Sequence, residues 1–280
     1  MDIKGLFGLE KKNVVITGAG SGMGYAATRL LRDLGADVYA VVRRKPLDFS
    51  VTKEIRADLG NEEGCEHMVR ECPETIDALF LCHGIANAPG KANALQVQLT
   101  NFYSFLYLTE RLLPRIADNG SVTFISSDGG KDWRRSVKEC REIISCKSWS
   151  EAAAWYQSHP NCTGDGYVFA KKCQNVYVMD RCHEPEFINR KIRLNAIAPG
   201  MTKTGLTEDF NRSVTGDPAQ GQAILEKHSL DFWNGRWASP EEMGYPLVTV
   251  GSRIFSYMSG QILYIDYGTA SLWEMNELTS

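Results

Sequence analysis

Apolar residues recur along the chain with two different periods. Short runs rich in β-branched and aromatic residues, such as Asn13–Thr17 (NVVIT) and Asp37–Val42 (DVYAVV), predict buried strands. Residues 25–34 carry apolar positions at helical spacing and end at Gly35, which predicts a helix between these two strands. Further strands are expected at 78–82, 121–125, 192–197 and 261–265. Strands separated by helices predict βαβ units, and therefore an α/β fold with a doubly wound parallel sheet.

No repeat, linker or low-complexity tract divides the 280 residues, so we expect a single domain over 1–280. Residues 131–166 form the irregular part of this domain. They are charged, rich in Trp and Cys, and interrupted by Pro160 and Gly164. We interpret them as a helical insertion, with helices expected at 134–144 and 150–157.

The first predicted strand runs into a glycine-rich turn, and a helix follows. Residues 18–24 read Gly-Ala-Gly-Ser-Gly-Met-Gly. Glycines allow a tight turn and let the N–H groups at a helix N-terminus approach a pyrophosphate. This arrangement predicts a Rossmann-type dinucleotide site that includes Gly18, Ser21, Gly22, Met23 and Gly24. A turn of the same composition without a ligand is the alternative.

The end of the second strand indicates which dinucleotide is preferred. A fold that prefers NAD places an acidic residue there to bond the ribose 2′-OH. This chain has Val42 followed by Arg43 and Arg44. Two guanidinium groups can clamp a 2′-phosphate, so we predict NADP(H) as the preferred cofactor and NAD(H) as a second one. Two solvated arginines at a strand end are the alternative.

Tyr167 and Lys171 are four residues apart at the start of a predicted helix and so share a face. A nearby ammonium favours the phenolate and is expected to lower the pKa of Tyr167. Tyr167 is therefore a candidate general acid for carbonyl reduction, or general base for alcohol oxidation. The strand at 121–125 ends in Ser126 and Ser127, at the sheet edge where ligands bind. A serine hydroxyl there can hold a substrate oxygen, although two turn serines are the alternative.

These motifs stand in the order found in the short-chain dehydrogenase/reductase family, which the chain resembles from residue 13 to about residue 268. The resemblance implies a catalytic tetrad of Asn101, Ser127, Tyr167 and Lys171. Tyr167 would be the acid or base, and Lys171 would lower its pKa and bind the nicotinamide ribose. Ser127, the second serine of Ile-Ser-Ser, would hold the substrate oxygen. Asn101 would anchor a water in a proton relay.

The resemblance also assigns cofactor contacts outside the tetrad. Asp58 and Leu59 match the segment at the adenine, and the segment after 198 would meet the carboxamide. The remaining assigned positions are His83, Gly84, Pro199, Gly200, Met201, Thr202 and Thr204.

The chain departs from the family pattern in three places. Cys82-His83-Gly84 replaces Asn-Ala-Gly, and we interpret His83 as structural rather than catalytic. Asp266-Tyr267-Gly268 replaces Asp-Gly-Gly. The gap from Ser127 to Tyr167 is unusually long and resembles the 3α-hydroxysteroid dehydrogenase/carbonyl reductase group. That group acts on steroids and other bulky ketones, including bile-acid-like substrates.

The family resemblance implies two further properties. One is a homo-oligomer, a dimer or a tetramer, whose assembly the insertion would affect. The other is a substrate lid over 201–237, with Phe210, Phe232, Trp233 and Trp237 on it. These aromatic residues suit a flat apolar ligand, or they pack the lid onto the body, and both interpretations stay open.

Charge, apolar runs and cysteine spacing argue against several classes of protein. A net charge of -3 provides no basic face, so nucleic acid is not an expected partner. We see no signal peptide and no run of apolar residues long enough for a membrane span, so a cytoplasmic location without membrane contact is expected. The 8 cysteines contain no C-x-x-C pair, which favours free thiols and no metal site.

The sequence thus predicts an NADP(H)-dependent oxidoreductase that interconverts a secondary alcohol and a ketone. Its small-molecule substrate is expected to be a hydroxysteroid or a bile-acid-like compound. A reductase of another carbonyl compound or of a quinone, an enone reductase and an epimerase are alternatives on the same fold. A non-catalytic NADP(H)-binding sensor is the alternative of another class, and an intact tetrad argues against it.

Overall fold

The computed structural model describes residues 2–88 and 90–279, and its centre is one sheet of seven parallel strands. The strand order is β3-β2-β1-β4-β5-β6-β7, so the direction of winding reverses between β1 and β4. Ligands bind at such a reversal in open α/β sheets. The bounds are β1 Asn13–Thr17, β2 Asp37–Val42, β3 Lys53–Arg56, β4 Ile76–Leu81, β5 Ile116–Ile125, β6 Arg193–Pro199 and β7 Ile262–Ile265. The predicted doubly wound parallel sheet is confirmed.

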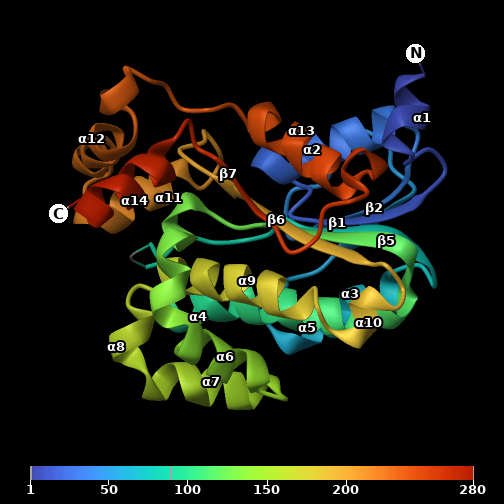
Figure 1. Ribbon diagram of the computed structural model, residues 1–280, viewed down its shortest axis with the longest axis horizontal. Coiled ribbons are helices and arrows are strands. Elements are labelled where there is room, and N and C mark those ends of the chain that lie inside the picture. Colours follow the sequence, from blue (N-terminus) through green and yellow to red (C-terminus); the bar gives the residue numbers. More distant parts are fainter. Residues whose placement is uncertain (1, 89, 280) are drawn as a thin grey trace.

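Helices cover both faces of the sheet (Figure 1). One face carries α1 (Ile3–Phe7), α2 (Gly22–Asp33) and α13 (Pro240–Gly251). The other carries α3 (Glu62–Glu71), α4 (Ala94–Gln98), α5 (Ser104–Leu112), α9 (Tyr167–Arg181) and α10 (Pro185–Ile188). Burial from both sides explains why strands such as β1 are continuously apolar rather than alternating.

The sequence pattern missed one strand. β3 is four residues long, and only Ile55 within it is buried. Its other residues, Lys53, Glu54 and Arg56, are polar, which suits a strand at one edge of the sheet with β2 as its neighbour. Its existence depends on that pairing and not on its own hydrophobicity.

The insertion forms an additional helical layer. It contains the 3-10 helix η3 (Asp128–Ser136), α6 (Val137–Ser145), α7 (Trp149–Ser158) and α8 (Pro160–Thr163), so the helix expected at 134–144 is divided near Ser136. In Figure 1 helices α6, α7 and α8 lie below α4 and α9, on the side away from the sheet. The Trp155 ring stacks on Phe169 of α9 with centroids 5.8 Å apart, and Trp149 contacts Tyr103 edge-on at 5.4 Å. The insertion therefore packs against α9 and η1 of the same chain. The homo-oligomer stays a prediction.

Several segments gather beyond the carboxyl ends of the strands. They are α11 (Thr207–Thr215), α12 (Pro218–Ser229), η4 (Asp231–Trp233) and α14 (Thr269–Thr279). Together with the turns after β1, β4, β5 and β6 they surround the place where the sheet winding reverses. Within residues 2–88 and 90–279, no helix combines the length and the apolar character needed to cross a bilayer.

Candidate active site

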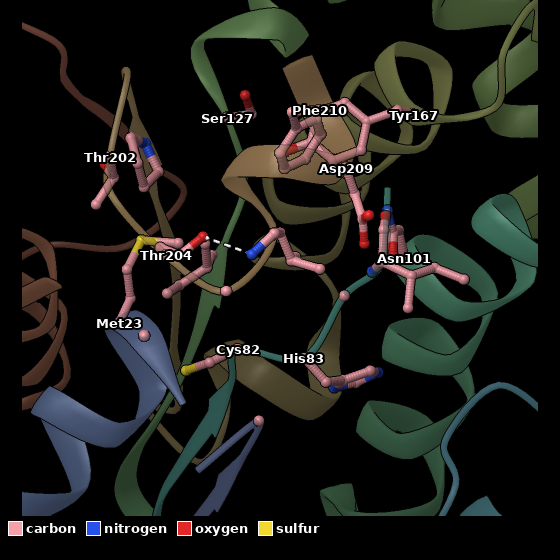
Figure 2. A pocket seen from close by; sticks show the side chains of 18 of the residues that line it. Met23, Cys82, His83, Asn101, Ser127, Tyr167, Thr202, Thr204, Asp209 and Phe210 are labelled. Atoms are coloured by element: carbon pink, nitrogen blue, oxygen red, sulfur yellow. Dashed lines mark hydrogen bonds between the residues drawn. The ribbon is translucent and has the colours of Figure 1, made fainter. Parts of the chain in front are cut away.

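A cavity of about 670 Å³ opens at the carboxyl ends of the strands. Every residue that the sequence analysis assigned to the cofactor or to the tetrad lines this one cavity. Figure 2 shows Asn101, Ser127 and Tyr167 reaching it from three different elements. The structure thus brings together residues that lie far apart in the sequence.

The glycine-rich turn connects β1 to α2 at one end of the cavity. Gly18 has a φ of +66°, and a Cβ there would lie 2.8 Å from the carbonyl oxygen of Cys82. A Cβ on Gly24 would clash with the carbonyl oxygen of Gly18, since α2 packs directly against the turn. The turn therefore requires glycine for conformation and for close approach, and it leaves the N-terminus of α2 facing the cavity. These features fit a dinucleotide pyrophosphate.

Three cations line the cavity beyond the end of β2. Arg43 and Arg44 were predicted there, and Lys45 joins them. Lys45 could have been found, because it continues the same basic run. Asp58 also lines the cavity, and its Oδ1 accepts a hydrogen bond from Gly60 N at 3.0 Å, which holds the turn after β3.

Tyr167 and Lys171 occupy the first turns of α9, as predicted. The Lys171 Nζ lies 5.5 Å from the centroid of the Tyr167 ring. It donates hydrogen bonds to the carbonyl oxygen of Ile125 at 2.8 Å and to Gln174 Oε1 at 3.4 Å. Only 4% of Lys171 is exposed, so these contacts define its position.

The pKa of Tyr167 departs from the expected direction. Burial raises it above the ordinary value, the hydrogen bond with Ser127 lowers it in part, and the charges of Asp128 and Asp165 raise it further. Burial also lowers the pKa of Lys171 to about 7, so the ammonium that should favour the phenolate is only partly populated at neutral pH. The protein therefore holds Tyr167 as a neutral phenol.

The two serines after β5 have different roles. The Ser126 hydroxyl donates to Asn175 Oδ1 at 2.7 Å and so faces α9. The Ser127 hydroxyl donates to Asp128 Oδ1 at 3.0 Å and is also within hydrogen-bonding reach of Tyr167. A neutral Tyr167 can donate to the Ser127 oxygen while the Ser127 proton goes to Asp128. Burial raises the pKa of Asp128 to about 6, and the neighbouring Asp266 contributes to this rise.

Asn101 lies in a π-helical segment, η1 (Leu99–Tyr103), between α4 and α5. Its side chain accepts from Ile85 N and donates to Ile85 O, both at 2.8 Å, and this ties the chain after β4 to the helix. Its main-chain carbonyl accepts from Gln174 Nε2 at 2.6 Å. Because Nε2 must donate to that carbonyl, Oε1 is the atom that faces Lys171. Gln174 thus bridges Asn101 and Lys171 directly, while a water anchored by Asn101 stays a prediction.

His83 takes part in a buried hydrogen-bond chain at the floor of the cavity. Its Nδ1 lies 2.7 Å from Thr17 Oγ1 and its Nε2 lies 2.7 Å from Ser104 Oγ. The Ser104 hydroxyl donates to the carbonyl oxygen of Thr100, so it accepts from His83 Nε2–H. Burial lowers the pKa of His83 to about 3, and the nearby Lys171 acts in the same direction. Both ring nitrogens are therefore occupied in a neutral imidazole, which favours the structural interpretation.

The aromatic residues between 201 and 237 separate into two groups. Phe210 packs edge-on against the Tyr167 ring with centroids 4.7 Å apart (Figure 2), and Trp237 also lines the cavity. Trp233 instead stacks on Tyr267 at 3.7 Å, and Phe232 is 44% exposed. Ligand contact is thus open to Phe210 and Trp237, whereas Trp233 packs against the body of the protein.

Two residues near the tetrad were missed. Asp128 directly follows Ser127, and its position after a strand end was the available signal. Gln174 is a polar residue three positions after Lys171 on the buried face of α9, where it is fully buried. Helical spacing places it beside Lys171, but only the tertiary structure shows that its amide reaches Asn101.

The comparisons with known proteins agree with this geometry. The family model described as short chain dehydrogenase matches residues 12–137, and the model described as Enoyl-(Acyl carrier protein) reductase matches residues 176–270. A coniferyl-alcohol dehydrogenase of Pseudomonas sp. strain HR199 is 33% identical over 265 residues, covering 95% of this chain and 99% of that protein. The 3-alpha-hydroxysteroid dehydrogenase/carbonyl reductase of Comamonas testosteroni is 23% identical over 256 residues, covering 91% and 95% of the two chains.

Solved structures share the fold. The 3-alpha-hydroxysteroid dehydrogenase of Pseudomonas sp. B-0831 in complex with NADH has a TM-score of 0.70 at 21% identity and covers 93% of this chain and 98% of that one. The NADP complex of Pseudomonas aeruginosa RhlG has a TM-score of 0.66 at 22% identity and covers 95% and 98%. The order of motifs, the single parallel sheet and the full-length match lead to one conclusion: the chain belongs to the short-chain dehydrogenase/reductase family, whose oxidoreductases act on alcohol and carbonyl groups.

Proposed function

We propose that this protein is an NADP(H)-dependent dehydrogenase of a ring-bearing alcohol, or a reductase of the corresponding carbonyl compound, with Tyr167 as the proton donor and acceptor. The observation that carries the proposal is the position of Tyr167. Its ring contacts Phe210 of the 201–237 segment, and it lines the same cavity as Ser127. A ring-bearing substrate that enters beside Phe210 brings its oxygen to the hydroxyls of Tyr167 and Ser127.

The residues around the cavity fit a nicotinamide dinucleotide. The turn at 18–24 offers main-chain N–H groups to a pyrophosphate, and Arg43, Arg44 and Lys45 offer positive charge where a 2′-phosphate would lie. When bound, the nicotinamide supplies the hydride transfer that no side chain of this protein can perform. Lys171 and the 199–204 segment would hold the nicotinamide ribose and carboxamide.

The side chains near the reacting carbon handle the proton. A phenol that burial keeps neutral is ready to donate, as carbonyl reduction requires. In the oxidation direction the phenolate form of Tyr167 accepts the alcohol proton and becomes the phenol, and the protonated fraction of Lys171 nearby favours the phenolate that this step requires. Ser127 and Tyr167 hydroxyls together bind the substrate oxygen as its charge changes. Gln174 positions Lys171 for this task through its bond to Asn101.

An aromatic alcohol is the substrate class that we favour. Phe210, Trp237 and Trp273 line the cavity and offer flat apolar surfaces. The relative at 33% identity is a coniferyl-alcohol dehydrogenase, and coniferyl alcohol is an uncharged aromatic alcohol.

A hydroxysteroid is the second candidate. The apolar lining continues past Phe210 to Val214 and Leu225, which offers length for several fused rings. The relative that acts as a 3-alpha-hydroxysteroid dehydrogenase/carbonyl reductase supports this class at lower identity. The 201–237 segment would act as the lid over either substrate.

The experiment is to follow the absorbance of the reduced nicotinamide with NADP(H) and NAD(H) in parallel. Coniferyl alcohol, benzyl alcohols and their aldehydes form one substrate set, and hydroxysteroids with their ketones form the other. We expect turnover in the aromatic set with NADP(H). Turnover of the steroid set alone would replace the first candidate by the second. No turnover with either set, despite tight NADPH binding, would favour the non-catalytic sensor.

A further inference from the structure

The two ends of the cavity differ in their balance of charge, although Asp58 lines the basic end as well. Arg43, Arg44 and Lys45 line the end where β2 stops. Three carboxylates line the other end, around Tyr167: Asp128 after β5, Asp165 before α9 and Asp209 on α11. The sequence analysis assigned none of these three to the site.

The three carboxylates differ in how their charge is compensated. Asp209 Oδ1 accepts from Lys91 Nζ at 2.5 Å and is therefore ion-paired. Within the part of the chain that the structure describes, neither Asp128 nor Asp165 has an ion-pair partner. Asp128 is held by the Ser127 hydroxyl at 3.0 Å, and Asp165 Oδ1 accepts from the main-chain N of Tyr167 at 3.0 Å. Two carboxylates without an ion-pair partner in the described part of the chain, Asp128 and the more exposed Asp165, thus lie near Tyr167.

Lys171 offsets this charge only in part. Its Nζ is directed to the carbonyl oxygen of Ile125 and to Gln174, beneath the reacting end of the cavity. Burial lowers its pKa to about 7, so at pH 8 most of this side chain is neutral. Both carboxylates line the cavity with Tyr167, and their charges add to the rise in the Tyr167 pKa that burial mainly causes. A substrate oxygen at Tyr167 therefore lies in a negative field.

We propose that Asp128 and Asp165 select uncharged or cationic alcohols and exclude substrates that carry a carboxylate. This inference rests on the proposed function and specifies its substrate class. Like charges brought together in a desolvated site repel strongly, whereas a hydroxyl or an amine on the substrate can donate to a carboxylate. Neutral aromatic alcohols and neutral hydroxysteroids then remain substrates, while aromatic acids and bile-acid-like compounds do not.

Binding of three matched probes tests the proposal without requiring turnover. The probes are 4-methylbenzyl alcohol, 4-(hydroxymethyl)benzoate and 4-(aminomethyl)benzyl alcohol, which differ mainly in charge. Affinities are measured with NADP⁺ present in the Tyr167→Phe variant at pH 8, from the quenching of tryptophan fluorescence, since Trp237 and Trp273 line the cavity. We expect the carboxylate to bind at least about tenfold more weakly than the neutral alcohol. In the wild-type enzyme, kcat/KM for the same probes should rank in the same order as these affinities.

Substitutions then identify the residue responsible. Asp128→Asn keeps an acceptor for Ser127 and removes the charge, so it should narrow the difference between carboxylate and neutral probe about threefold or more. Asp165→Asn should narrow this difference in affinity less, because Asp165 is more exposed to solvent. Asp231→Asn is the matched control, since Asp231 is exposed on η4 and outside the cavity lining.

Each outcome decides one of the two proposals. Equal binding of the carboxylate and neutral probes overturns the charge selectivity alone, and so does a difference that neither Asp128→Asn nor Asp165→Asn changes. If NADP⁺ binds but no probe does, the aromatic-alcohol proposal fails and this inference falls with it.

Discussion

The two ends of the cavity are built in different ways. The cofactor end is made of main chain and of neighbouring residues: the turn at 18–24 and the basic run Arg43 to Lys45 are each continuous in the sequence. The substrate end is made of side chains from η3, α9, α11 and α14, which are far apart in the sequence. Its aromatic and acidic residues meet only because the sheet edge collects the loops that carry them.

This difference explains why a sequence motif predicts the cofactor end of the cavity but not the substrate end. A turn that approaches a pyrophosphate needs glycine at defined positions, because a Cβ would clash whatever the substrate is. The substrate end has no such backbone requirement, so many side chains can form it. Variants at the two ends should therefore affect different steps, and the following predictions test that separation.

The largest effect is expected from removal of the Tyr167 hydroxyl. Tyr167→Phe should lower kcat by about 10²–10⁴-fold, because the general acid is lost while the ring still packs against Phe210. Cofactor affinity, measured by NADPH fluorescence titration, should stay close to wild type. Tyr177→Phe is the matched control on the same helix, since its hydroxyl bonds Glu110 away from the cavity. Comparable turnover in the two variants would contradict the role of Tyr167.

Loss of charge at the cofactor end should change cofactor preference. Arg43→Ala and Arg44→Ala together should raise KM for NADPH about tenfold or more, with a smaller change for NADH, because only NADPH carries the 2′-phosphate. The check is steady-state kinetics with both cofactors and one substrate. Arg70→Ala on α3 is a surface control. An equal rise in KM for NADPH and for NADH would show that the arginines do not bind the 2′-phosphate.

Gln174 links Lys171 to Asn101, so its substitution should have an effect on kcat smaller than that of Tyr167→Phe. Gln174→Met should lower kcat about tenfold, because Lys171 loses an acceptor and the buried Asn101 carbonyl loses its donor. Gln174→Glu places a carboxylate beside Lys171, which should raise the pKa of Lys171 above about 7 and move the pH–rate profile to higher pH.

A purely structural Gln174 would leave the pH profile of the Glu variant unmoved. Gln157→Met, on the exposed face of α7, controls for the change of residue type.

The smallest effect is expected on stability, from His83 beneath the cavity. Its pKa is about 3 in the folded protein and near 6.5 in the unfolded chain, so the unfolded chain binds an extra proton between these values. The free energy of unfolding should therefore fall as pH decreases from about 6.5 towards 3. His83→Gln should cost about 1 kcal/mol at pH 8 through lost hydrogen bonds, but it should show a shallower decline in acid.

Urea unfolding at several pH values measures both slopes. His228→Gln, at an exposed position of α12, is the control. Equal slopes in wild type and His83→Gln would mean that His83 is not held neutral.

The sequence predicted six of the seven strands, and the start of α9 at Tyr167 was placed correctly. These elements have strong local signals: continuous apolar runs for strands buried on both faces, and helical spacing after a Gly. β3 was missed because an edge strand buries only one residue. Helix α2 begins at Gly22 rather than at 25, because the glycines of the turn also form the first helical turn.

The pKa of Tyr167 was expected to fall, and the structure raises it. The expectation took Lys171 as a charged neighbour four residues away, which is what helical spacing alone can say. The depth of burial changes the sign, because desolvation acts on both groups and partly neutralises the lysine. Burial of this kind depends on η3 and the insertion packing around α9, and no local motif encodes it.

By itself the sequence determined the doubly wound fold and the dinucleotide turn, because each depends on local constraints of backbone conformation or periodicity, and the motif order indicated the tetrad. The tertiary structure decided which groups act on one another. It placed Asp128 and Asp165 beside Tyr167, occupied both nitrogens of His83, and linked Lys171 to Asn101 through Gln174. Charge and hydrogen bonding act through space over a few ångströms, so their outcome depends on packing between segments that the sequence keeps far apart.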